Sequence, residues 1–241
     1  MGWGREEQVV LPNPEVVTVT DPDAPVKKRF RERTLPEVVS KEITHAVGGR
    51  KATRVSQALL EASKAYERER FGDALKVLRA VAEDTPDVAA VRELTGLCLY
   101  RQGKWAEAIR ELQRFTEITG SVEQNPVLAD CHRALRHYGV VDELWEELAA
   151  ASPNAELVTE GRIVMAGSLA DQGRLTDAIR LLERAPGGGR RVRDHHLRLW
   201  YALADLYERA GELPRARELF SRIMEIDGDL ADVVTRVANL A

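Results

Sequence analysis

Hydrophobic positions between residues 55 and 228 follow a pattern that repeats about every 34 residues. One column of this frame holds small or aliphatic residues at successive offsets of 34, 36, 34 and 38: Ala74, Ala108, Leu144, Ala178 and Ala216. An aromatic residue stands three positions before the first two members, at Phe71 and Trp105. Self-similarity with a period of roughly 20 to 50 residues is typical of repeat proteins, in which each repeat is one supersecondary unit.

Three further columns agree with the frame. The first is mostly small: Ala62, Gly96, His132, Ala166 and Ala204. The second is mostly glycine: Glu69, Gly103, Gly139, Gly173 and Gly211. The third is large and apolar: Leu78, Leu112, Leu148, Leu182 and Phe220. Because glycine adopts the left-handed conformation that ends helices at little cost, the glycine column predicts a turn between two helices. The small columns predict that these two helices approach closely.

The frame resembles the tetratricopeptide repeat (TPR) superfamily, whose unit has small residues at its eighth and twentieth places and a bulky residue at its seventeenth. The resemblance covers five units: 55–88, 89–122, 125–158, 159–192 and 197–228. It implies an all-α, right-handed α-solenoid of about five TPR-like helical hairpins. Residues 119–220 also resemble actinobacterial TPR proteins of unassigned function. The third unit departs from the pattern at His132 and Leu144, so we expect it to be looser or differently angled.

A stack of hairpins exposes an apolar face at each end, so we expect a capping helix at both ends. Residues 34–54 hold a capping box from Thr34 to Glu37 and a short amphipathic helix that ends at Gly48-Gly49. Residues 229–241 predict a final helix capped at Asp229, with an apolar stripe at Leu230, Val233, Val234, Val237 and Leu240. Residues 1–33, which are rich in proline and charge, predict an extended or disordered arm.

Composition places the chain among globular proteins, since 44% of its residues are hydrophobic and 31% are charged. The net charge of −4 is unevenly distributed: −4 over residues 1–25, +6 over residues 26–54 and −6 over residues 55–241. Two cysteines, Cys98 and Cys131, are too few for a disulfide framework, and the chain shows no secretory leader. We therefore expect a cytoplasmic protein. No apolar run approaches the roughly 20 residues that span a bilayer, so no membrane partner is expected.

Candidate catalytic and metal-binding residues are few. Asp194-His195-His196 offers three ligand types, but adjacent helical residues point about 100° apart and no second cluster completes a site. Neither Gly187-Gly188-Gly189 nor Gly48-Gly49-Arg50-Lys51 has the spacing of a phosphate-binding loop. We interpret both cysteines as small buried hydrophobic residues. The sequence predicts no enzyme, no metal and no cofactor.

The TPR resemblance implies a concave groove lined by the first helix of each unit. Tyrosine and arginine are residue types that carry much of the binding energy at interfaces. The residues predicted to bind a partner are Tyr66, Tyr100, Arg101, Arg133, Arg136, His137, Tyr201 and Asp205. The chaperone-tail clamp of the family is disfavoured, because its lysine and asparagine positions hold Leu59, Ser63 and Leu94.

Arg133, Arg136 and His137 stand at i, i+3 and i+4, which predicts one basic helical face. That face favours an acidic or C-terminal carboxylate ligand. The alternative is that these side chains pair with neighbouring acids across the groove. The leading hypothesis is therefore a non-enzymatic scaffold that binds a peptide or helix of another protein.

A second hypothesis concerns the basic segment before the repeats. Its candidate contacts to nucleic acid are Lys27, Lys28, Arg29, Phe30, Arg31 and Arg33. Basic side chains with an embedded aromatic can bind phosphates and stack on a base, as in an RNA- or ribosome-associated adaptor. The alternative, which the charge balance favours, is an arm folded back on the acidic repeats.

Overall fold

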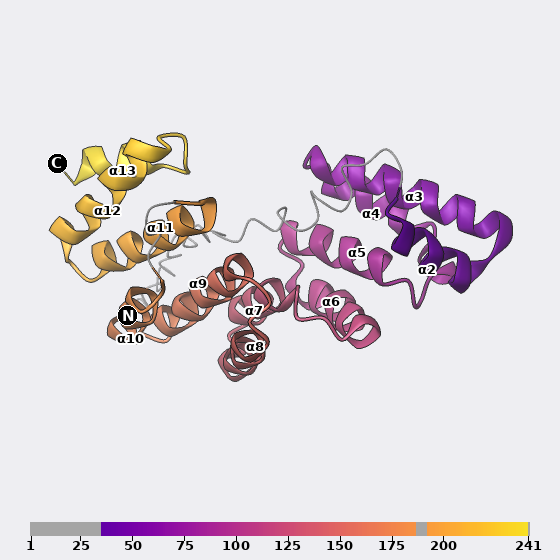
Figure 1. Ribbon diagram of the computed structural model, residues 1–241, viewed down its shortest axis with the longest axis horizontal. Helices are drawn as coiled ribbons and strands as arrows, with labels where there is room; N and C mark the ends of the chain where they lie inside the picture. The colour runs from indigo at the N-terminus through magenta and orange to yellow at the C-terminus, as the bar shows by residue number, and fades with distance from the viewer. Residues whose placement is uncertain (1–34, 187–191, 241) are drawn as a thin grey trace, which may run out of the picture.

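The computed structural model describes residues 35–186 and 192–240, and every regular element in these ranges is a helix. The helices form five antiparallel hairpins arranged in an arc (Figure 1). The first helices of the hairpins are α3 (Gly49–Glu67), α5 (Ala89–Arg101), α7 (Asn125–Ala134), α9 (Ala155–Asp171) and α11 (Asp194–Arg209). The second helices are α4 (Phe71–Arg79), α6 (Trp105–Thr119), α8 (Tyr138–Ala151), α10 (Leu175–Glu183) and α12 (Leu213–Ile226). The predicted α-solenoid of helical hairpins is confirmed.

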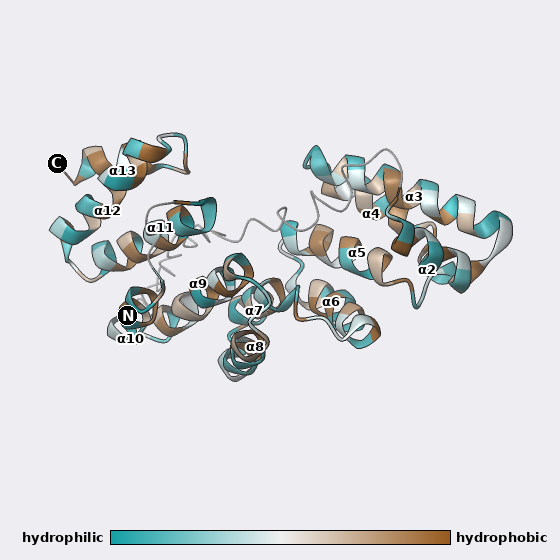
Figure 2. Cartoon of the chain, viewed as in Figure 1, coloured by the Kyte–Doolittle hydropathy of each residue, from teal (hydrophilic) through white to brown (hydrophobic). Residues whose placement is uncertain are grey.

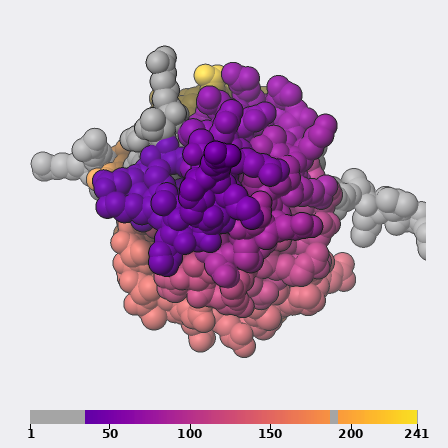
Figure 3. Space-filling model, turned by 90° about the vertical axis from the view of Figure 1, so that its right-hand side faces the viewer, coloured from indigo at the N-terminus to yellow at the C-terminus, as the bar shows by residue number. Residues whose placement is uncertain are grey.

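Helix α2 (Glu37–Val47) covers the beginning of the solenoid, and α13 (Val233–Asn239) covers its end. Figure 3 shows α2 and α3 together at the N-terminal end. The predicted capping box is wrong: Pro36 is the residue before α2, while Thr34 lies outside the described residues. The predicted linker up to residue 54 is also helical, because α3 begins at Gly49, directly after the left-handed Gly48. At the other end, α13 begins after Asp232 rather than at Asp229.

Small residues bring the two helices of a hairpin together. Ala74, Ala108, Ala178 and Ala216 are all 0% exposed, as the periodic pattern predicts. Gly96 lies against Leu112, and a Cβ atom added to this glycine would lie 2.6 Å from both Cγ and Cδ2 of that leucine. Hydrophobic residues accordingly lie between the helices, and hydrophilic residues cover much of the outward faces (Figure 2).

The same turn closes every hairpin, and it fixes the register of the repeats. A backbone N–H donates to the carbonyl five residues earlier in each: Arg70 to Ala65, Lys104 to Leu99, His137 to His132, Arg174 to Leu169 and Glu212 to Tyr207. The residue before each donor is left-handed: Glu69, Gly103, Arg136, Gly173 and Gly211. The predicted position of Gly139 in this column is wrong, because Gly139 lies inside α8.

The third hairpin is therefore shifted by three residues from the frame read in the sequence. His132 closes the turn, where Leu99 and Leu169 stand in other hairpins. Ala129, not His132, takes the small position of the first helix. Val141, not Leu144, takes the buried position of the second helix, and it is 0% exposed. The departures of the third unit from the pattern reflect this shift.

Two large hydrophobic clusters make up the core. One extends from α2 to α7, and the other from α9 to α13. A small cluster of Ala129, Val141 and Val164 lies between them, at the third hairpin. Gly161 of α9 also packs there against Leu148 and Trp145 of α8. Apolar packing is thus least extensive at the third hairpin, where polar contacts join the two halves.

Candidate functional site

The first helices line the inner side of the arc, and α6, α8 and α10 lie on its outer side (Figure 1). Each first helix contacts the first helix of the next hairpin: α3 with α5, α5 with α7, α7 with α9, and α9 with α11. We call the surface formed by these five helices the inner face. Its polar side chains connect residues that lie about 30 to 38 positions apart in the sequence.

The first two hairpins are joined to each other and to the third by three such contacts. Nη2 of Arg101 lies 3.4 Å from Oε1 of Glu69, and its guanidinium lies over the ring of Phe71. Gln124 donates from Nε2 to Glu93 at 3.1 Å. The hydroxyl of Tyr100 donates to Oδ2 of Asp130 at 2.7 Å, which links α5 to α7.

Arg133 occupies the centre of the inner face and joins α7 to α9. Its Nη1 lies 3.0 Å from Oδ1 of Asp130, and its Nε lies 2.8 Å from Oδ2 of Asp171. Gly167 leaves room for this side chain, because a Cβ atom there would lie 2.7 Å from Nη1 of Arg133. With Tyr100, these groups form a continuous chain of hydrogen bonds across three hairpins.

Two arginines form ion pairs with carboxylates in the last part of the inner face. Arg198 of α11 lies 2.5 Å from Glu160 and 3.7 Å from Glu156, both of α9. Arg236 of α13 bridges back to α11, 2.5 Å from Asp205 and 2.9 Å from Glu208. In the same region, Tyr201 donates a hydrogen bond to Asp232. The C-terminal helix is thus held to the fifth hairpin by charge-assisted contacts.

The inner-face ladder, as we name this set of contacts, carries an excess of negative charge. Its carboxylates are nine: Glu69, Glu93, Asp130, Glu156, Glu160, Asp171, Asp205, Glu208 and Asp232. Its guanidinium groups are five: Arg101, Arg133, Arg198, Arg209 and Arg236. The formal charge of the ladder is therefore −4. Each of these arginines is paired with a carboxylate, so the excess charge of the ladder is negative.

Two family models described as tetratricopeptide repeat match the chain, one over residues 59–121 and the other over residues 158–229. Together they cover more than half of its 241 residues. The chain belongs to the TPR superfamily. TPR proteins are in general scaffolds for protein–protein interaction without an enzymatic activity. The unmatched part between the two models contains α7 and α8, which form the shifted third TPR hairpin.

Solved structures share this TPR fold. The crystal structure of TTC0263, a thermophilic TPR protein in Thermus thermophilus, is 16% identical with a TM-score of 0.59, over 76% of this chain and 97% of that one. A structure of MamA (AMB-1) is 20% identical with a TM-score of 0.50, over 78% of this chain and 97% of that one. At these identities the similarity concerns the fold alone. No curated protein matches the chain.

The predicted tyrosine contacts of the TPR groove are buried. Tyr66, Tyr100 and Tyr201 are only 1 to 3% exposed. Tyr66 packs edge-on against Phe71, and Tyr100 and Tyr201 donate to carboxylates of neighbouring helices. Tyr66 thus packs within the first hairpin, Tyr100 links the second hairpin to the third, and Tyr201 links the fifth hairpin to the residue before α13. The three buried rings do not present an aromatic surface to a ligand. Sequence periodicity places a residue on a helical face, but it does not show how far the next helix covers that face.

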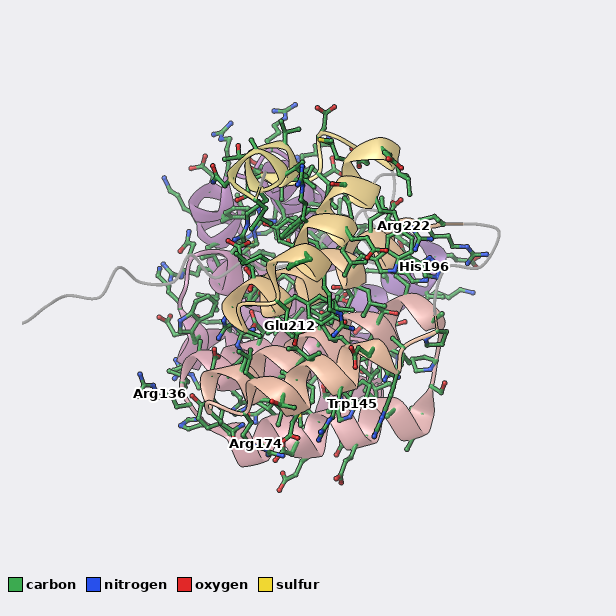
Figure 4. The ribbon with its side chains drawn as sticks, turned by 90° about the vertical axis from the view of Figure 1, so that its left-hand side faces the viewer. Arg136, Trp145, Arg174, His196, Glu212 and Arg222 are labelled. Carbon is green, nitrogen blue, oxygen red and sulfur yellow. The ribbon has the colours of Figure 1, made fainter. Side chains whose placement is uncertain are left out.

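The predicted basic face of Arg133, Arg136 and His137 is wrong. Helix α7 ends at Ala134, so Arg136 and His137 lie in the turn, and Arg136 has a left-handed backbone with φ of 60°. Arg136 projects from the edge of the molecule opposite His196 (Figure 4). Arg133 pairs with two aspartates, as the alternative interpretation predicted. The argument for an acidic ligand is thereby removed.

The other predicted contacts of the inner face, Arg101 and Asp205, both belong to the ladder. Sequence reasoning missed most of its carboxylates, Asp130 and Glu160 among them, which are only 4% and 6% exposed. Burial of an ionisable side chain favours a partner nearby, but the sequence does not identify that partner. Lys27, Lys28, Arg29, Phe30, Arg31 and Arg33 lie outside the described residues.

The candidate ligands Asp194-His195-His196 belong to the start of α11. Nδ1 of His196 accepts a hydrogen bond from the backbone N–H of Arg193 at 3.0 Å, which satisfies the helix terminus. Burial lowers the pKa of His195, whose ring stacks on that of His196. Within residues 35–186 and 192–240, no group of three or more His, Cys, Asp or Glu side chains is placed to hold a metal ion.

Both cysteines are fully buried, as predicted. Burial raises the pKa of the Cys98 thiol to about 12 and also raises the pKa of Cys131, where the nearby Asp130 adds to the effect. A thiol with so high a pKa is a poor nucleophile at neutral pH. Among the described helices, none is both long and apolar enough to cross a bilayer.

Proposed function

We propose that the inner face of this TPR scaffold binds a peptide or helix of another protein, and that this ligand is basic. The observation that supports the proposal is the formal charge of −4 on the inner-face ladder. Several of its carboxylates remain accessible, since the side chains of Glu69 and Glu156 are 73% and 49% exposed. Lysine and arginine side chains of a ligand would supply cations to a ladder that holds more carboxylates than guanidinium groups.

The same charge argues against nucleic acid as the ligand of this face. Phosphate groups need lysine or arginine to neutralise them. The five arginines of the ladder are already engaged by carboxylates. A phosphate backbone would therefore meet repulsion along the inner face.

The proposal is tested by charge reversal at exposed ladder positions in the full chain. The inner-face variant carries Glu69→Lys and Glu156→Lys, whose present ion pairs are long, at 3.4 and 3.7 Å. The matched control carries Glu146→Lys and Glu218→Lys on the second helices α8 and α12, which changes the net charge equally at exposed positions. The probes are fluorescein-labelled nona-arginine and nona-glutamate.

We expect the unchanged chain to bind nona-arginine and not nona-glutamate. The inner-face variant should lose about tenfold in affinity, which corresponds to about 1.4 kcal/mol, and the control should lose less than about twofold. Binding should weaken as the salt concentration rises. An equal loss in both variants, or preferential binding of nona-glutamate, would contradict the proposal.

A further inference from the structure

We propose that residues 27–33 of the chain itself bind the inner face and compete there with the partner peptide. This inference rests on the proposed function, because both ligands use the same acidic surface. Its consequence is a scaffold whose own basic segment lowers its affinity for partners.

Charge complementarity is the first argument. Residues 27–33 contain five basic side chains and one acidic side chain, Glu32, for a formal charge of +4. The inner-face ladder has a formal charge of −4. Within the first 54 residues, the basic charge is concentrated in this segment. The segment therefore has the composition that the inner face would select from a partner protein.

The place where the chain enters the solenoid is the second argument. Leu35 is only 8% exposed and belongs to the same hydrophobic cluster as Val39 and Ile43. Helix α2 packs on α3, and Glu42 accepts a hydrogen bond from the backbone N–H of Ala89, at the start of α5. Residue 35 is thus fixed in the hydrophobic cluster at the N-terminal end of the solenoid, where α2 packs on α3.

The length of the segment matches the surface that it would cover. An extended residue spans roughly 3.3 to 3.6 Å, so residues 27–33 reach about 25 Å. Packed helices lie roughly 8 to 10 Å apart, so this distance covers about three successive first helices. Starting from residue 35, the segment reaches the inner faces of α3, α5 and α7 and the exposed Glu69 in the turn after α3.

Because the segment is covalently attached to the solenoid, it can occupy the inner face even if its intrinsic affinity for that face is modest. A ligand on a short tether has an effective concentration on the order of millimolar. If the segment binds with a dissociation constant near 100 µM, a competing peptide would lose on the order of tenfold in apparent affinity. Removing the basic charges of the segment should raise the apparent affinity for the competing peptide by the same factor.

Zero-length cross-linking of the full chain tests where the segment lies. A carbodiimide joins an amine to a carboxylate only when the two are in contact, and Lys27 and Lys28 supply the amines. We expect links to accessible inner-face carboxylates such as Glu69, and none to Glu146 or Glu218 of the second helices. In a mixture of isotope-labelled and unlabelled chains, the links should join residues of one chain. Links confined to other surfaces, links only between chains, or no link from Lys27 or Lys28 to the inner face would overturn the inference.

A peptide titration separates this inference from the proposed function. The probe is a fluorescent peptide with the sequence VKKRFRERT, residues 26–34. It is titrated against the unchanged chain and against a variant with Lys27, Lys28, Arg29, Arg31 and Arg33 replaced by glutamine. We expect the variant to bind about tenfold more tightly. Equal affinity would overturn competition by the segment and leave the proposed function standing. Binding to neither chain would overturn both.

Discussion

Nε of Arg133 in the third hairpin lies 2.8 Å from Oδ2 of Asp171 in the fourth. The same guanidinium contacts Asp130, which also accepts a hydrogen bond from Tyr100 of the second hairpin. A single side chain thus connects the two halves of the solenoid where the apolar core is least extensive. The structural role of this arginine explains why it is not available as the primary contact of an acidic ligand.

Arg133→Met should destabilise the fold by about 2 to 4 kcal/mol, because it leaves the buried Asp130 without its cation. The matched control is Arg174→Met, which removes an ion pair with Asp177 at a largely exposed position and should change stability by less than about 0.5 kcal/mol. Denaturant unfolding measures both. Similar effects of the two substitutions would show that the central contact does not join the halves.

Gly96→Ala should destabilise the chain although alanine is the better helix former. The added Cβ atom meets Leu112 at 2.6 Å, and overpacking of this kind costs about 1 to 3 kcal/mol, more than the gain of about 1 kcal/mol in helix propensity. Gly139→Ala is the control, because nothing lies within 4 Å of its Cβ position inside α8. That substitution should stabilise the chain by about 0.5 to 1 kcal/mol. A destabilising Gly139→Ala would favour the register read from the sequence over the observed one.

His132→Leu should reduce the dependence of stability on pH. Burial, and then the neighbouring His137, lowers the pKa of His132 below its ordinary value of 6.5. As pH falls below about 6.5, the unfolded chain binds a proton that the folded chain resists, so the folded state loses stability. Leucine occupies the equivalent position in two other hairpins, at Leu99 and Leu169.

Unfolding free energies at pH 7.5 and 5.5 measure this effect. The loss on acidification should be smaller in the variant, by at most about 1.4 kcal/mol per pH unit. His195 has a pKa lowered in the same direction, and because it is present in both chains its contribution cancels in the comparison. Identical losses in the two chains would refute the role of His132.

Cys98 and Cys131 should not react with a thiol reagent while the chain is folded. Burial raises the pKa of both thiols, that of Cys98 to about 12, so the reactive thiolate is scarce and the sulfur is covered. At pH 8 the folded chain should release almost no chromophore from dithiobis(nitrobenzoate), and the chain in denaturant should release two equivalents. Rapid reaction of either cysteine in the folded chain would contradict the packing of α5 or α7.

The repeated pattern predicted the fold well because close helix packing demands small residues at fixed places. Ala74, Ala108, Ala178 and Ala216 are buried as expected. The repeating frame misplaces the third hairpin because it aligns Gly139 with the turn glycines of the other hairpins. In the structure, Arg136 has the left-handed backbone and Gly139 lies in a helix. A non-glycine residue in the left-handed conformation and a glycine in a helix each cost only a modest amount of free energy.

The candidate site could be predicted only in part. The sequence places Arg133 and Asp205 on first helices, but their partners Asp171 and Arg236 lie 38 and 31 residues away. Which side chains meet depends on the rotation between successive hairpins, and no local pattern encodes that rotation. The negative excess of the ladder is a property of these long-range pairs, so no single repeat displays it.

Hydrogen exchange with and without nona-arginine tests the central claim most directly. The chain used is the variant with glutamine at positions 27, 28, 29, 31 and 33, so that its own basic segment does not compete. The peptide should slow exchange in the first helices α5, α7, α9 and α11, with a smaller effect on the second helices α6, α8, α10 and α12. Protection confined to the second helices, or no change in any helix at a saturating peptide concentration, would contradict an acidic inner face that binds a basic partner.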